Sequence, residues 1–217
     1  MRRRDQSTSS GYRFALALAA VGLAAVSCTD ESAPSMNENE EVPGARSSSS
    51  TSEVSINGTL REVSDNTGDS ITYDPELAPV GAVLRVKSES ENDSTTVTLE
   101  VEGLLPDRGY AVHAHTDHCG PTGDKAGPHY QHEVDPQATP DNPSHDPRYA
   151  NPRNEIWLDV VTNDEGSGET SAQVPFVFTD HAPNSVVVHE AETTRTGPGE
   201  AGKAGGRIAC LTVPFDG

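Results

Sequence analysis

Histidines are concentrated in one short stretch of the chain. Five of the eight histidines lie between residues 109 and 132, and the first 108 residues contain none. In a β-strand successive side chains point to opposite faces, so His113 and His115 would share one face while Val112 and Ala114 occupy the other. Imidazole is a ligand for copper, zinc, iron and nickel. This spacing therefore predicts a metal site on one face of a strand whose other face packs.

Two further histidines stand where strands or their edges would position them. His129 follows a Gly-Pro turn, and His189 ends the run Ser-Val-Val-Val-His. An all-histidine set without thiolates or a carboxylate triad indicates copper or zinc, whereas a closed structural zinc site would prefer thiolates close in sequence. The candidate metal ligands are therefore His113, His115, His129 and His189.

The elements that must position these side chains are short strands. Val97, Leu99 and Val101 alternate with polar residues, and the other expected strands show the same period of two. Such runs occupy residues 54–61, 82–87, 96–101, 109–115, 156–162, 172–178, 185–190 and 207–213. About eight short strands separated by turn residues indicate an all-β fold, an antiparallel sandwich or barrel.

Two long loops interrupt the strand pattern, at 116–155 and 190–206, and both flank histidines. Loops of this length inside a compact domain are usually functional. Together the strands and loops form one domain over 54–217, a normal size for a single domain.

The N-terminus reads as an export signal over residues 1–28. Arginines precede an apolar run at 14–26 that is too short to span a bilayer. The ending Ala-Ala-Val-Ser-Cys28 fits a bacterial lipobox, in which Cys28 becomes the lipidated first residue; a plain signal peptide with an incidental cysteine is the alternative. We therefore expect an exported lipoprotein of the cell envelope, held by its lipid at the outer face of the membrane or in the periplasm.

Residues 29–53 contain almost nothing apolar and predict a disordered tether between the lipid and the domain. Once Cys28 is assigned to the lipid, an even pair of cysteines remains. In an oxidising compartment Cys119 and Cys210 are expected to form a disulfide.

The chain is strongly acidic, with a formal net charge of −19. Nucleic-acid binding requires clustered lysine and arginine, which this sequence lacks, so we expect no nucleic-acid partner. The acidity is typical of a soluble domain at a cell surface or in a salty medium.

Six segments, taken in order, resemble the copper/zinc superoxide dismutase family, and the resemblance covers most of 54–217. They are residues 109–115, Cys119, 126–130, 161–166, 186–190 and 205–210, the last of which ends Arg-x-x-Cys.

The resemblance implies an eight-stranded antiparallel Greek-key β-barrel with copper bound on its outer face between the two long loops. The implied activity is disproportionation of superoxide to dioxygen and hydrogen peroxide, with the four histidines as copper ligands. It also implies the Cys119–Cys210 disulfide and a catalytic role for Arg207, whose permanent charge would guide the anionic substrate.

The sequence departs from the family where a zinc ion would bind. In the family the histidine that matches His129 bridges copper to zinc, but the expected zinc ligands are missing from the loop that follows. We therefore expect a copper-only relative, with zinc binding through His132 or His145 as the alternative. Two other functions stay open: a non-catalytic copper-binding or copper-buffering surface lipoprotein, and a metal-free interaction module.

Overall fold

The computed structural model of the chain describes residues 52–64, 68–139, 142–179 and 181–216. The predicted signal peptide at 1–28, with Cys28, lies outside these residues, as does the predicted tether up to residue 51. Both stay predictions. The first strand begins at Ser52, two residues before the expected start of the domain.

Four antiparallel strands form the first sheet, in the order β1-β4-β5-β9. Their bounds are Ser52–Thr59 (β1), Val83–Glu91 (β4), Ser94–Glu102 (β5) and Gly168–Val174 (β9). A two-residue turn joins β4 to β5, and both of its residues, Asn92 and Asp93, have positive φ. That backbone conformation matches the twist of the flanking strands, and Asn and Asp tolerate it well.

The second sheet carries the histidines and has the order β2-β3-β11-β10-β7. Its strands are Arg61–Glu62 (β2), Ser70–Thr72 (β3), Arg207–Thr212 (β11), Ser185–His189 (β10) and Val112–His115 (β7). Among the described strands, only β2 and β3 pair in parallel. A third, two-stranded antiparallel sheet pairs β6 (Gly109–Tyr110) with β8 (Val160–Val161).

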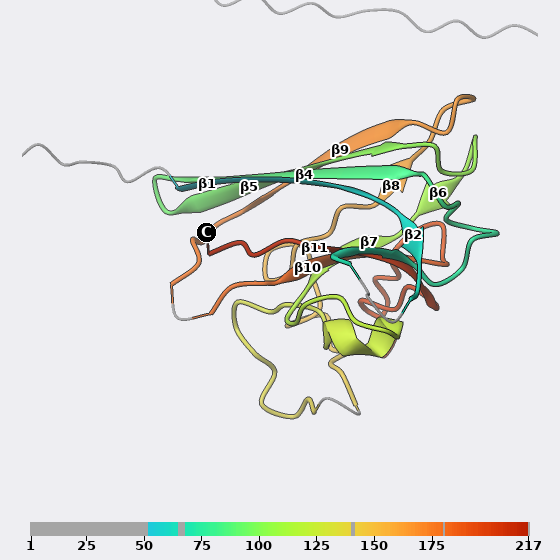
Figure 1. Cartoon of the computed structure of the whole chain (residues 1–217). Helices are drawn as coiled ribbons and strands as arrows, with labels where there is room; N and C mark the ends of the chain where they lie inside the picture. The colour runs from blue at the N-terminus through green and yellow to red at the C-terminus, as the bar shows by residue number, and fades with distance from the viewer. Residues whose placement is uncertain (1–51, 65–67, 140–141, 180, 217) are drawn as a thin grey trace, which may run out of the picture. The chain divides into compact units, whose positions relative to one another are not determined.

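The two sheets lie as two layers with the main hydrophobic core between them (Figure 1). The first sheet contributes Leu84, Val86 and Leu99, and the second contributes Val188 and Leu211, all at most 1% exposed. A smaller apolar cluster lies on the other face of the second sheet, where the 3-10 turn η1 (Gly123–Ala126) covers it. The period of two thus separates a core face from an outer face on which a loop is packed.

The expectation of an all-β fold is confirmed, while the strand count differs. The described residues contain eleven strand segments, because some expected runs are broken and β3 was missed. Leu60 separates β1 from β2, because its backbone N–H donates to Ala82 O and its carbonyl oxygen accepts from the N–H of Gly81. Pro175 lacks an N–H group, and β9 ends before it. Closure of the two sheets into a Greek-key barrel stays a prediction.

Helices play almost no part in the described residues, where η1 is the only one. None of the described helical structure is long and apolar enough to cross a membrane.

Candidate metal centre

Strand register brings three of the histidines to the outer face of the second sheet. In β7, Val112 and Ala114 lie in the core, so His113 and His115 point the other way. Val187 of β10 pairs with His113, and the register shifts just before His189. By the period of two, His189 shares the outer face of β10 with Val187, and the irregularity, which leaves Ile208 of β11 without a partner in β10, places Arg207 opposite His189.

The fourth histidine comes from the loop after β7. His129 forms an isolated β-bridge with His115, because the chain returns along the edge of β7 after the η1 turn. The four side chains each offer one ring nitrogen, and these four atoms lie within 4.8 Å of one another. His113 and His115 are fully buried, His189 is 3% exposed, and His129 is partly exposed. The structure thus assembles all four predicted ligands into one cluster.

In each imidazole ring, the hydrogen bond made by one nitrogen determines whether the other nitrogen can bind a metal. Nδ1 of His115 donates to the carbonyl oxygen of Gly127 at 2.9 Å, and Nδ1 of His129 lies 3.0 Å from Oε2 of Glu155. In neutral imidazole one nitrogen carries the proton and the other has a lone pair. With Nδ1 protonated in both rings, Nε2 of His115 and Nε2 of His129 are free to bind.

Other contacts in the cluster also fit a metal ion. Nε2 of His115 lies 3.2 Å from Nε2 of His189, and Nδ1 of His113 is buried without a hydrogen-bond partner. Buried polar atoms in native proteins nearly always have a partner, so an orphan that faces three imidazoles is the expected position of a metal ligand. Four imidazoles without thiolates suit copper or zinc.

Burial keeps these ligands neutral. It lowers the pKa of His113 and of His115 well below the usual value, and repulsion from the neighbouring histidines lowers the pKa of both further. For His189, burial with added repulsion from His129 and Arg207 lowers the pKa to about 3. Since a metal binds the neutral ring, three of the four ligands are ready to bind at neutral pH.

A buried carboxylate supports the fourth ligand. Glu155 is 1% exposed, and its Oε2 receives hydrogen bonds from His129 Nδ1 and from Trp157 Nε1 at 2.7 Å. Its Oε1 accepts from Nε2 of Gln131, also at 2.7 Å. A buried charge is tolerated when it is paired and hydrogen-bonded. Glu155 therefore fixes the orientation of His129 through the nitrogen that points away from the cluster.

Glu155, Trp157 and Asp159 were not among the predicted site residues, although a signal for them is present. Ile156, Leu158 and Val160 are buried in the core, so the residues between them face the histidines. The segment runs antiparallel beside β7, where Trp157 bridges to His113. The sequence showed the alternation of apolar and polar residues in this segment. It did not show that the polar residues face the histidine cluster.

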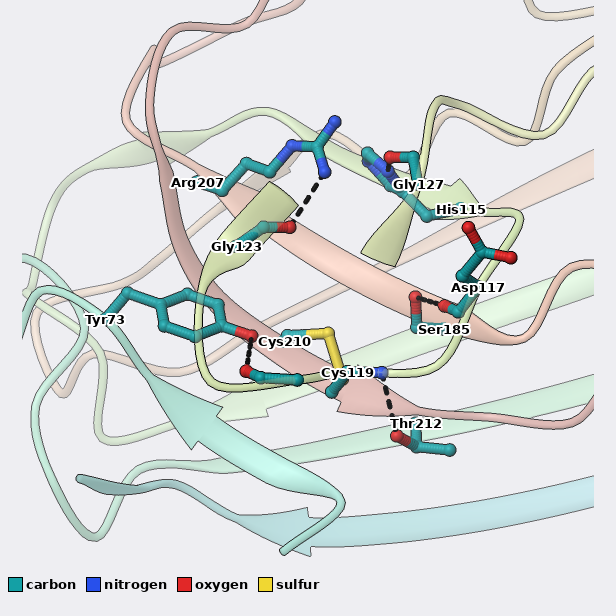
Figure 2. The surroundings of a disulfide bond; sticks show 11 residues. Tyr73, His115, Asp117, Cys119, Gly123, Gly127, Ser185, Arg207, Cys210 and Thr212 are labelled. Atoms are coloured by element: carbon teal, nitrogen blue, oxygen red, sulfur yellow. Dashed lines mark hydrogen bonds between the residues drawn. A yellow bond between two sulfur atoms is a disulfide. The ribbon is translucent and has the colours of Figure 1, made fainter. Parts of the chain in front are cut away.

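The Cys119–Cys210 disulfide predicted from the sequence is confirmed, with Cα atoms 5.8 Å apart. Figure 2 shows the bridge tying the loop after β7 to β11. Around it, the Tyr73 hydroxyl donates to Gly120 O at 2.9 Å, and the amide of Cys119 donates to the hydroxyl of Thr212 at 3.2 Å. The loop that carries Gly127, the partner of His115, is therefore fixed at its base.

Arg207 starts β11, three residues before Cys210. Its Nη1 donates to the carbonyl oxygen of Gly123 at 2.8 Å, which leaves the rest of the guanidinium directed away from the loop (Figure 2). Partial burial lowers the pKa of Arg207, opposed by nearby Asp124, yet a guanidinium stays charged at any physiological pH. A cleft of about 1280 Å³ lies here, and its lining includes Arg207, His129 and His189.

The two histidines considered for zinc lie elsewhere. The exposed ring of His132 stacks on Phe176, with centroids 4.1 Å apart, and Nδ1 of His145 donates to Ala201 O at 3.0 Å. Among the described residues, neither belongs to a group of three or more potential metal ligands.

Comparison with known proteins adds one finding. A model of the copper/zinc superoxide dismutase family matches residues 80–213, more than half of the chain, and this range contains the four histidines, the disulfide and Arg207. No curated protein matches the chain.

Proposed function

The chain belongs to the copper/zinc superoxide dismutase family, and we propose that it is a dismutase that converts superoxide to dioxygen and hydrogen peroxide at copper. The observation that carries this proposal is the four-histidine cluster, in which two rings are hydrogen-bonded through the nitrogen that faces away from the other ligands. A bound copper ion would supply one-electron redox chemistry, oxidising one superoxide ion and reducing the next.

The side chains around the cluster supply the remaining functions. Arg207 provides a fixed positive charge at the cleft of a chain whose net charge is −19, so it would draw a small anion toward the histidines and orient it. His129 is the most exposed of the four ligands and lines the same cleft as Arg207, so its ring is accessible to substrate and water. Glu155 keeps that ring oriented during turnover.

We further propose that the centre holds copper without zinc. A zinc ion bridged to copper would need Nδ1 of His129, and this atom is engaged by the buried carboxylate of Glu155. A hydrogen-bonding partner of this kind fixes the tautomer and orientation of a metal-ligating histidine. Glu155 would thereby perform the orienting role that zinc performs in the family.

The proposed setting is the cell envelope, with Cys28 lipidated and the domain exported. The export signal in the sequence supports this proposal, and so does the disulfide, because disulfides persist in oxidising compartments. The expected disordered tether would let the domain extend from the membrane.

Replacing Arg207 by alanine tests the catalytic proposal. We expect the second-order rate constant for superoxide consumption to fall by at least about ten-fold, because electrostatic guidance raises association rates by 10–1000-fold. Copper content should not change, since Arg207 is not a ligand. The wild-type rate should fall as ionic strength rises, and in Arg207→Ala this dependence should weaken or reverse. Pulse radiolysis over a salt series measures both effects.

Arg153→Ala is the matched control, because it removes an equal charge from an exposed side chain. We expect a rate and a salt dependence close to those of the wild type. Copper binding without superoxide consumption in the wild type would reject the dismutase proposal and favour a copper-buffering protein.

A further inference from the structure

Thr194 contacts a copper ligand from 81 residues away in the sequence. It lies between β10 and β11, is 6% exposed, and places its hydroxyl oxygen 2.7 Å from Nε2 of His113. Neither its residue type nor its position marks it as a functional residue. The contact matters because it occupies Nε2 of His113, while Nδ1 of this ring, the nitrogen nearer the backbone, is buried without a partner, as is Nδ1 of His189.

Asp159 determines the direction of this hydrogen bond. Its Oδ1 lies 2.6 Å from the Thr194 hydroxyl, and its Oδ2 accepts from the backbone N–H of Thr194 at 2.7 Å and from the hydroxyl of Thr193 at 3.0 Å. An ionised carboxylate only accepts hydrogen bonds, so the single hydroxyl proton of Thr194 must point to Asp159. The hydroxyl oxygen can then only accept from His113.

This series of hydrogen bonds determines which nitrogen of the His113 ring carries the proton. With Nε2 protonated and donating to Thr194, Nδ1 carries the lone pair, and it is buried without a partner beside the other histidines. If the hydroxyl donated to Nε2 instead, the proton would sit on Nδ1, and that nitrogen could not bind a metal.

We propose that Thr194 is a positioning residue, directed by Asp159, that sets the tautomer of His113 and so presents Nδ1 to copper. This inference rests on the proposed copper site. It assigns to the loop between β10 and β11 a direct part in building the metal centre, although that loop supplies no ligand.

Thr194→Val tests the proposal, because valine keeps the shape and removes the hydroxyl. We expect copper affinity, measured by competition with a chelator, to fall by about 10–100-fold, which is the usual effect of losing the hydrogen-bond partner of a ligand. The electron paramagnetic resonance spectrum of bound copper should also change. Thr194→Ser should restore both affinity and spectrum, since it keeps the hydroxyl.

Thr193→Val is the matched control. Its hydroxyl reaches the same carboxylate but does not contact His113, so affinity and spectrum should stay at wild-type values. Asp159→Asn is a second route to the same result if Thr194→Val folds poorly, because the amide no longer forces the hydroxyl proton away from His113. Histidine-selective proton–nitrogen NMR on metal-free protein should show Nε2–H for His113 in the wild type and a mixture of tautomers in this variant.

The results separate this inference from the proposed function. Wild-type affinity and spectrum in Thr194→Val, or an Nδ1–H tautomer in the wild type, would overturn the role of Thr194 while leaving the copper site intact. A wild-type protein that binds no copper would overturn both. Lack of dismutase activity with normal copper binding would affect only the proposed function, since none of these readouts depends on turnover.

Discussion

Glutamine in place of Glu155 is expected to lower copper affinity by about 10–100-fold and the free energy of unfolding by about 1–3 kcal/mol. The buried carboxylate accepts hydrogen bonds from His129, Trp157 and Gln131. A glutamine side chain has a similar size, but its NH₂ group would face at least one of these donors. Whichever way the amide lies, one buried N–H would lose its acceptor, and Nδ1 of His129 would face either the NH₂ group or a neutral amide oxygen, which is a weaker acceptor than the carboxylate.

Glu133→Gln is the control for this substitution, because it removes one carboxylate from an exposed position in the same loop. Surface changes of this kind usually alter stability by less than about 0.5 kcal/mol. Chelator competition and urea unfolding of the two variants give the comparison. Equal copper affinity in Glu155→Gln and Glu133→Gln would show that Glu155 does not hold the copper ligand.

Removal of the disulfide, by replacing Cys119 and Cys210 with serine, should cost about 2–5 kcal/mol of stability. The bridge joins residues 91 apart in sequence, so its loss frees a long loop in the unfolded chain. Loss of the disulfide should also reduce the rate of superoxide consumption by a larger fraction than it reduces the copper content. The loop it anchors carries Gly123, whose carbonyl group holds Arg207, so the guanidinium would lose its fixed place.

The control for the disulfide is Ser185→Ala, which removes a single hydrogen bond to the same loop, from the Ser185 hydroxyl to Asp117 O at 2.6 Å. We expect a loss near 1 kcal/mol and little change in activity. Thermal and urea unfolding of the disulfide-free protein and of Ser185→Ala measure the two losses of stability. A disulfide-free protein as stable and active as Ser185→Ala would contradict the anchoring role of the bridge.

Local patterns were sufficient to predict much of this fold. The alternation in β4 and β5 identified both strands, and the His-x-His pair placed His113 and His115 on the face opposite Val112 and Ala114. These features depend on the period of two in a strand, which a sequence displays directly. β3, with three residues, is too short to show such a period.

The surroundings of the metal centre could not be predicted in the same way. The contact between His113 and Thr194 spans 81 residues, and the contact between His129 and Glu155 crosses most of a long loop. Such contacts depend on how loops pack against the sheet, and one sequence does not reveal this. The sequence showed that the expected zinc ligands are absent. Only the three-dimensional structure showed that the carboxylate of Glu155 accepts a hydrogen bond from Nδ1 of His129.

Metal content measured together with turnover tests the central claim most directly. The protein would be loaded with excess copper and zinc, freed of unbound metal, and compared with His189→Ala for bound metal and superoxide consumption. We predict one copper and no stoichiometric zinc in an active wild type, and loss of both copper and activity in the variant. A stoichiometric zinc ion beside copper, or bound copper without superoxide consumption, would contradict a copper-only dismutase.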